Sequence, residues 1–236
     1  QSLFANSLDL AKQGVTQATL NNGLKIVVKT DRRAPVFISQ LWYKVGASDE
    51  SRPTTGVSHM LEHMMFKGTQ QFKPGEFSRI ISEQGGQENA FTGQDYTGYY
   101  QKLESSRVET SFKMEADRMH NLVLLEDEFK KEVEVVKEER RMRTDDKPTR
   151  KTAEIFHAAA FRYSPYSAPI IGWMNDLENM TVGDAQEWYD RWYAPNNAVL
   201  VLVGDVDPKE VYSLAQKYYG KIKSRPIASL ALRKPH

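Results

Sequence analysis

The chain contains no cysteine. A protein without cysteine forms no disulfide bond, has no thiolate nucleophile and cannot build a zinc site from thiolate ligands. Any metal ion that it binds must therefore be held by histidine, aspartate or glutamate. The lack of cysteine leaves the compartment open, since cysteine-free chains occur on both sides of a membrane.

Long apolar runs and an excess of one charge are also absent. The longest apolar run, Ala198 to Val203, is far shorter than the ~20 residues that a membrane-spanning helix needs, so we expect no membrane span. The formal net charge of +1 gives no electrostatic reason to expect nucleic acid or an anionic membrane as a partner. The 236 residues suffice for one large domain or two small ones with a substantial core.

The order of the expected secondary-structure elements predicts an α+β fold, with a largely antiparallel sheet flanked by helices. Hairpins come first, helices follow, and a strand and a helix close the pattern, without a regular βαβ alternation. The expected strands span residues 18–31 around an Asn-Gly turn, 36–46, 87–94, 96–104 and 196–206, the last as a buried strand. The expected helices span residues 57–66, 74–84, 106–146 with a break near 125, a stretch after Pro148, 181–193 and 208–219.

The stretch HMLEHMMFKGT, residues 59–69, carries two histidines four residues apart. On a helix His59 and His63 lie on one face, one turn apart, so both imidazoles can reach a single metal ion. Glu62 borders the same face and is placed to hold a water on that ion rather than to bind it. The alternative is an ordinary helix whose histidines are satisfied by hydrogen bonds. Because this helix is apolar nearly all round, we expect it to be buried, where ionisable groups need a partner such as a metal.

Catalytic zinc commonly takes three protein ligands, so a third must come from His, Asp or Glu. The segment 126–146 is expected to be helical, and its apolar residues form one stripe: Phe129, Val133 and Val136. One turn further the stripe reaches Glu139 or Arg140, and Glu132 lies beside the same face. A carboxylate on a buried face is costly unless it is paired or bound to a metal. Glu139 is therefore a candidate third ligand, and a buried salt bridge to an arginine is the alternative.

Several motifs together resemble one known family. HMLEH has the form of the inverted zinc motif HxxEH, and EVEVVKEE, Glu132 to Glu139, is similar to the family's downstream segment. Further matching stretches run through nearly the whole chain: NGLKIVV, VGASDE, GGQENAFTGQDYTGYY and LVLVGDV. On these motifs the chain resembles the pitrilysin–insulysin family of zinc metallopeptidases, which includes the mitochondrial processing peptidase.

The resemblance implies roles for individual residues. One Zn2+ ion per chain would be held by three side chains: His59, His63 and Glu139. Glu62 is similar to the general base that activates the zinc-bound water, and Glu132 to a supporting acidic residue that orients a ligand. Asn89 and Ala90 match the strand along which family members pair the substrate backbone, a binding mode with little side-chain preference.

The function that the resemblance implies is that of a zinc-dependent endopeptidase domain, which hydrolyses peptides or unfolded polypeptide segments. The alternative is a non-catalytic homologue that serves as an assembly or substrate-presenting subunit. The four residues of the motif, including Glu139, favour the enzyme, because a scaffold has no physical need of them.

The resemblance also implies a partner, since family members usually carry two or more homologous domains around the cleft. We expect residues 1–222 to form one zinc-binding unit of a two-domain processing-peptidase-like fold, and residues 223–236 to begin a linker. The partner would be a homologous C-terminal domain or subunit. A chain that begins at Gln1 fits a cleaved export signal, so we expect a bacterial periplasmic or secreted location, with the mitochondrial matrix as the alternative.

Overall fold

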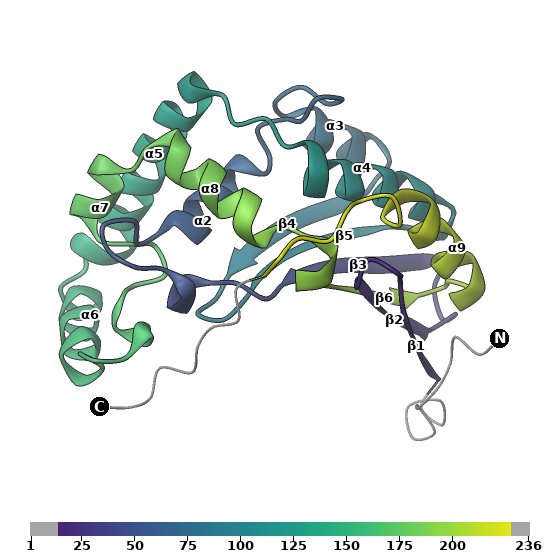
Figure 1. Ribbon diagram of the computed structural model, residues 1–236, viewed down its shortest axis with the longest axis horizontal. Coiled ribbons are helices and arrows are strands. Elements are labelled where there is room, and N and C mark those ends of the chain that lie inside the picture. Colours follow the sequence, from purple (N-terminus) through teal and green to yellow (C-terminus); the bar gives the residue numbers. More distant parts are fainter. Residues whose placement is uncertain (1–13, 228–236) are drawn as a thin grey trace.

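A computed structural model describes residues 14–227 of the chain, and within this range the strands form one six-stranded sheet (Figure 1). Its order is β1-β2-β6-β3-β5-β4. The strands are β1 (Val15–Thr19), β2 (Lys25–Thr30), β3 (Val36–Tyr43), β4 (Gln87–Thr92), β5 (Thr97–Glu104) and β6 (Ala198–Gly204). The pairing of β2 with β6 is parallel, and the other strand pairs are antiparallel, which confirms the expected α+β fold with a largely antiparallel sheet.

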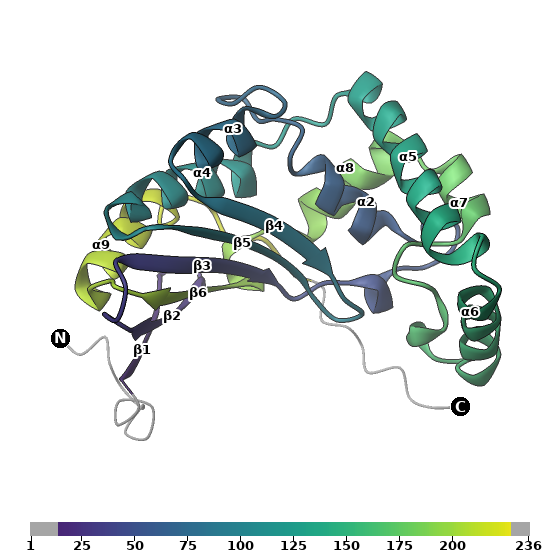
Figure 2. The same ribbon diagram turned by 180° about the vertical axis from the view of Figure 1, so that it is seen from behind.

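The helices gather on one face of the sheet (Figures 1 and 2). They are α2 (Val57–Met64), α3 (Glu76–Glu83), α4 (Val108–Asn121), α5 (Glu126–Arg140), α6 (Pro148–Ala160), α7 (Met174–Asn179), α8 (Val182–Trp192) and α9 (Pro208–Tyr218). Shorter turns are η1 (Ala47–Asp49), η2 (Ser105–Arg107), the π-helical η3 (Arg141–Asp145), η4 (Pro165–Ser167) and η5 (Pro195–Asn197). None of the described helices combines the length and the apolar character that crossing a membrane would require.

Strand β6 departs from its sequence-based expectation. Its continuous apolar run predicts a strand buried on both faces, but only alternate residues are fully buried: Ala198, Leu200, Leu202 and Gly204. The valines between them are half-buried, because within residues 14–227 the helices cover a single face of the sheet. β6 nevertheless lies in the middle of the sheet, where it joins β2 to β3.

Helix α2 carries the HMLEH motif and packs against α8 and α5 above one end of the sheet (Figure 2). It begins after Gly56, whose φ of 89° is in the left-handed region. A Cβ on Gly56 would lie 2.6 Å from the carbonyl oxygen of Ile171, so glycine permits the loop before α7 to approach the start of the helix. The Glu50 carboxyl accepts hydrogen bonds from the Gly56 and Ser58 N–H groups at 2.6 and 2.8 Å, and thereby caps the first turn.

Candidate metal centre

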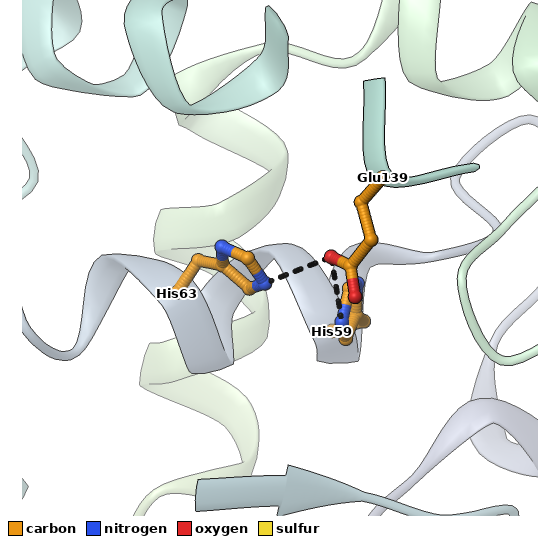
Figure 3. A group of neighbouring side chains, drawn as sticks. All are labelled: His59, His63 and Glu139. Atoms are coloured by element: carbon orange, nitrogen blue, oxygen red, sulfur yellow. Dashed lines mark ion pairs between the residues drawn. The ribbon is translucent and has the colours of Figure 1, made fainter. Parts of the chain in front are cut away.

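Two imidazoles from α2 and one carboxylate from α5 converge at a single point (Figure 3). The Nε2 atom of His59 lies 3.7 Å from Glu139 Oε2, and the Nε2 atom of His63 lies 3.5 Å from the same oxygen. The three candidate ligand atoms all lie within 4.8 Å of one another. The structure therefore brings together the three residues that the sequence analysis selected as ligands.

The spacing of these atoms fits a small divalent ion. A tetrahedral zinc ion with bonds of about 2.0–2.1 Å separates neighbouring ligand atoms by about 3.3 Å, close to the two distances at Glu139 Oε2. His59 adds a second observation, because its Nδ1 is buried without a hydrogen-bond partner and its Nε2 is too far from Glu139 for a hydrogen bond. An ion at the centre of the group would supply the Nε2 atom of His59 with a partner.

The protonation state of His59 suits a ligand. Burial, with smaller contributions from His63 and the Arg143 guanidinium, lowers the pKa of His59 to about 3. Its imidazole is therefore neutral near pH 7 and keeps a lone pair for coordination. A buried neutral imidazole next to a carboxylate is the donor set that zinc prefers when thiolates are lacking.

Glu132, about two turns of α5 before Glu139, lies against His63. Its Oε1 lies 2.9 Å from His63 Nδ1, and its Oε2 lies 2.5 Å from the Lys67 ammonium. Burial raises the pKa of Glu132, but the hydrogen bonds from His63 and Lys67 outweigh this effect and hold the pKa below its usual range. An ionised Glu132 accepts a hydrogen bond from the Nδ1–H group of His63. This tautomer leaves the lone pair on Nε2, which lies near Glu139.

From the sequence, Glu139 has two alternatives, a metal ligand or a buried salt bridge to an arginine, and the structure shows an ion pair whose arginine is exposed instead. One oxygen, Oε2, faces the two imidazoles, and the other, Oε1, lies 2.8 Å from Arg143 Nη1. Arg143 belongs to the π-helical turn η3 that follows α5, and its side chain is 73% exposed. The ion pair thus fixes the carboxylate without occupying the oxygen that faces the imidazoles.

Glu62 lies beside the cluster and is 9% exposed. The Thr92 hydroxyl donates to its Oε2 at 2.5 Å, from the end of strand β4. Burial raises the pKa of Glu62 above its usual range, although the hydrogen bond from Thr92 opposes the shift. A carboxylate of raised pKa next to a metal centre is a better proton acceptor than an exposed glutamate.

A cleft of about 920 Å³ lies beside the cluster and is lined by His59, Glu62, His63 and Glu139. Edge strand β4 forms one wall, with Asn89, Ala90 and Thr92. Side chains from α5, η3 and the loop before α7 form the other walls: Val135, Glu138, Met142, Ile170 and Ile171. The Ala90 N–H donates to the side-chain oxygen of Asn89 at 2.9 Å. The predicted substrate-binding pair therefore lies in the same cleft as the candidate metal ligands.

Three polar contacts of the site were not predicted from the sequence. They are Lys67 with Glu132, Thr92 with Glu62 and Arg143 with Glu139. The sequence analysis gave Lys67 no role, although it lies four residues after His63. Arg143 lies four residues after Glu139, a spacing at which side chains of a helix meet. Thr92 shares the face of Ala90 in a strand of period two, and this was the available signal.

Known proteins of one family are similar to this chain. Residues 25–173 match the family model of insulinase (peptidase family M16), and residues 179–236 match that of the peptidase M16 inactive domain. The zinc protease PqqE of Helicobacter pylori is 39% identical over 207 residues, which are 87% of this chain and 47% of that protein. A probable mitochondrial-processing peptidase subunit beta of Arabidopsis thaliana is 29% identical over 214 residues, 91% of this chain and 40% of that one.

Solved structures show the same fold. The crystal structure of a protease from Helicobacter pylori matches with a TM-score of 0.87 and 37% identity, over 89% of this chain and 51% of that chain. The periplasmic protease PqqL from Escherichia coli matches with a TM-score of 0.85 and 23% identity, over 92% of this chain and 25% of that one, and shows the fold alone. The chain spans about half the length of the curated relatives it matches. By the match over residues 25–173, the chain belongs to the insulinase family, peptidase family M16, which its motifs resemble.

Proposed function

We propose that this chain is the zinc-binding part of an endopeptidase that hydrolyses peptides or unfolded polypeptide segments. The convergence of His59, His63 and Glu139 on one point, with Glu62 beside them in an open cleft, is the observation that carries the proposal. The names of relatives support it, since PqqE of Helicobacter pylori is a zinc protease.

His59, His63 and Glu139 would hold one zinc ion in this function. A bound zinc ion supplies Lewis-acid activation, which lowers the pKa of water to ~7 and polarises a carbonyl group. The Nε2 atoms of the two imidazoles already lie near the carboxylate, so the ligands need little rearrangement. Glu132 keeps His63 in the required tautomer through its bond to Nδ1.

Glu62 is the general base in this proposal. Thr92 donates to Oε2, and we assign the proton transfer to Oε1. The raised pKa lets Glu62 take a proton from the attacking water and return it to the nitrogen of the leaving amine. The same carboxyl group thus serves as base and then as acid within one hydrolysis.

Strand β4 would bind the substrate as an added strand. Main-chain hydrogen bonds to an exposed sheet edge give affinity without strong side-chain preference. The side-chain amide of Asn89 would turn away from the Ala90 N–H, so that this N–H donates to a substrate carbonyl. An extended peptide on this edge passes directly beside Glu62, because Thr92 of the same strand contacts it.

A homologous second domain or subunit would complete the cleft. The proposal follows from the half-length match to curated relatives, and the limits of 1–222 for this unit and 223–236 for a linker remain predictions. A bacterial periplasmic or secreted location remains a prediction, and the name of the mitochondrial-processing peptidase subunit keeps the mitochondrial matrix as the alternative.

The experiment measures bound zinc by elemental analysis, and cleavage of a quenched peptide, in the wild-type chain, Glu139→Gln and Glu138→Gln. Glu138 is the matched control, because it is the adjacent glutamate and, among residues 14–227, forms its ion pair with Arg141 alone, whose side chain is 43% exposed. We expect one zinc ion per chain in the wild type and the control, and a large loss in Glu139→Gln. A wild-type chain that binds no zinc after reconstitution contradicts the proposal. Zinc without cleavage, even when the second unit is present, favours the non-catalytic subunit.

A further inference from the structure

We propose that Lys67 is a positioning residue of the metal centre, which acts through Glu132 to fix the orientation and tautomer of His63. The inference rests on the proposed function, because it concerns the same metal site. It assigns a role to a residue outside the candidate ligand set, whose ammonium pairs with Glu132.

The contacts form a chain from Lys67 to the metal cluster. The Lys67 ammonium lies 2.5 Å from Glu132 Oε2, and Glu132 Oε1 lies 2.9 Å from His63 Nδ1. Each carboxylate oxygen therefore has its own partner, one on either side of the group. His63 Nε2, the far atom of the ring, lies 3.5 Å from Glu139 Oε2.

The backbone places Lys67 for this contact. Lys67 lies three residues after Met64, the last residue of α2, and its N–H donates to the carbonyl oxygen of Met64 at 2.9 Å. This i to i−3 hydrogen bond continues the end of the helix as a turn, from which the Lys67 ammonium reaches Glu132. Because Glu132 belongs to α5, the lysine also pairs the end of α2 with α5.

Two hydrogen-bonding partners, one on each carboxylate oxygen, restrict the orientation of a glutamate side chain more than one partner does. The Glu132 side chain is 10% exposed, so water contributes little to the orientation of its carboxylate. Without the ammonium, the carboxylate keeps only the His63 bond and regains rotational freedom about its terminal torsion, which is broad. A charge-assisted bond on the opposite oxygen restricts that rotation and keeps Oε1 directed at Nδ1.

The orientation of Glu132 decides which nitrogen of His63 carries the proton. In a neutral imidazole one nitrogen donates and the other accepts, and the partner of one fixes the role of the other. With Oε1 held at Nδ1, the proton stays on Nδ1 and the Nε2 lone pair faces Glu139. When Glu132 turns away, the Nε2-protonated tautomer gains population, and this form cannot coordinate a metal through Nε2.

The experiment compares Lys67→Met, Lys67→Arg and Lys131→Met in the 236-residue chain. Lys131 is the matched control, because it is a lysine on α5 whose partner Glu128 is also a glutamate, in a pair that is far more exposed. The zinc dissociation constant is measured by competition with a chromophoric chelator. The tautomer of His63 is measured in the metal-free chain by nitrogen-15 NMR.

We expect Lys67→Met to raise the zinc dissociation constant about tenfold, the lower end of the effect of removing partners behind a ligand. The metal-free His63 of this variant should gain the Nε2-protonated tautomer. Lys67→Arg, which keeps the charge, and Lys131→Met should both stay within about twofold of the wild type. If Lys67→Met does not fold, Lys67→Gln is measured in its place, with the same expectation.

A Lys67→Met chain that loses stability but keeps both the zinc affinity and the tautomer of the wild type overturns the inference, because Lys67 then only neutralises Glu132. The NMR measurement separates this failure from failure of the proposed function. If the wild-type chain binds no zinc, the proposed function is wrong, and the tautomer of metal-free His63 still decides whether Lys67 positions the ring.

Discussion

Arg140, the residue after Glu139, holds the end of α5 to two other segments, and replacing it tests how firmly the metal site is supported. Its guanidinium donates to both carboxylate oxygens of Glu154 in α6, at 2.7 and 3.0 Å, and to the carbonyl oxygen of Gly172 at 2.8 Å. The side chains of Arg140 and Glu154 are only 5% and 13% exposed. Arg140→Met removes all three bonds and leaves a desolvated carboxylate without its partner.

The expected loss of stability follows from the burial of the pair. Removal of one partner of a buried ion pair costs about 3–5 kcal/mol, and the partial exposure of Glu154 favours the lower end, so we expect about 3 kcal/mol. With a urea m-value of about 3 kcal/mol/M, this loss lowers the unfolding midpoint by about 1 M. The double variant Arg140→Met/Glu154→Gln should regain about 1–2 kcal/mol, because it leaves no unpaired charge.

The adjacent arginine provides the control in the urea titration. Arg141 pairs with Glu138, and these side chains are 43% and 58% exposed. Arg141→Met should change the free energy of unfolding by no more than about 0.5 kcal/mol. The reasoning is refuted if Arg140→Met and Arg141→Met unfold within about 0.5 kcal/mol of each other, or if the double variant is less stable than Arg140→Met alone.

Two further predictions concern the base and the start of α2. Thr92→Val should lower kcat of the zinc-loaded peptidase about tenfold, because a hydrogen bond to a charged group contributes about 1.5–3 kcal/mol. KM should hardly change and Thr92→Ser should keep the activity, whereas a change in KM alone contradicts a role in holding Glu62. Burial raises the pKa of Glu50 to about 8, against the opposing hydrogen bonds from Gly56 and Ser58. The folded state then binds this proton more tightly than the unfolded chain. The contribution of Glu50 protonation to the free energy of unfolding is therefore complete below the usual glutamate pKa and is lost as pH rises toward about 8. Urea unfolding across this range should show a smaller pH dependence in Glu50→Gln, and equal slopes in both proteins contradict the assignment.

Much of the candidate site could be predicted from the sequence, because its main features follow from helix periodicity. His59 and His63 are four residues apart on a helix, which places them on one face wherever the helix packs. The stripe of α5 likewise predicted that Glu132 and Glu139 lie on or beside a buried face, and their side chains are 10% and 14% exposed. Such inferences need only the geometry of one element.

The partners of each side chain could not be predicted, because they come from other elements. Thr92 of β4 reaches Glu62 of α2, and Lys67 at the end of α2 reaches Glu132 of α5. The choice between a ligand and an ion pair for Glu139 was also open in the sequence, and the structure gives one carboxylate oxygen to each. These contacts depend on how helices and strands pack, which periodicity does not encode.

The sequence by itself determined the family, the α+β class and the residues proposed as metal ligands, since motifs and periodicity are local properties of the chain. Only the tertiary structure decided that β6 enters between β2 and β3, in parallel to β2, and that the helices cover one face of the sheet. Strand order and helix placement are set by packing between segments that lie far apart in the sequence, and this long-range packing brings Glu139 to the two histidines.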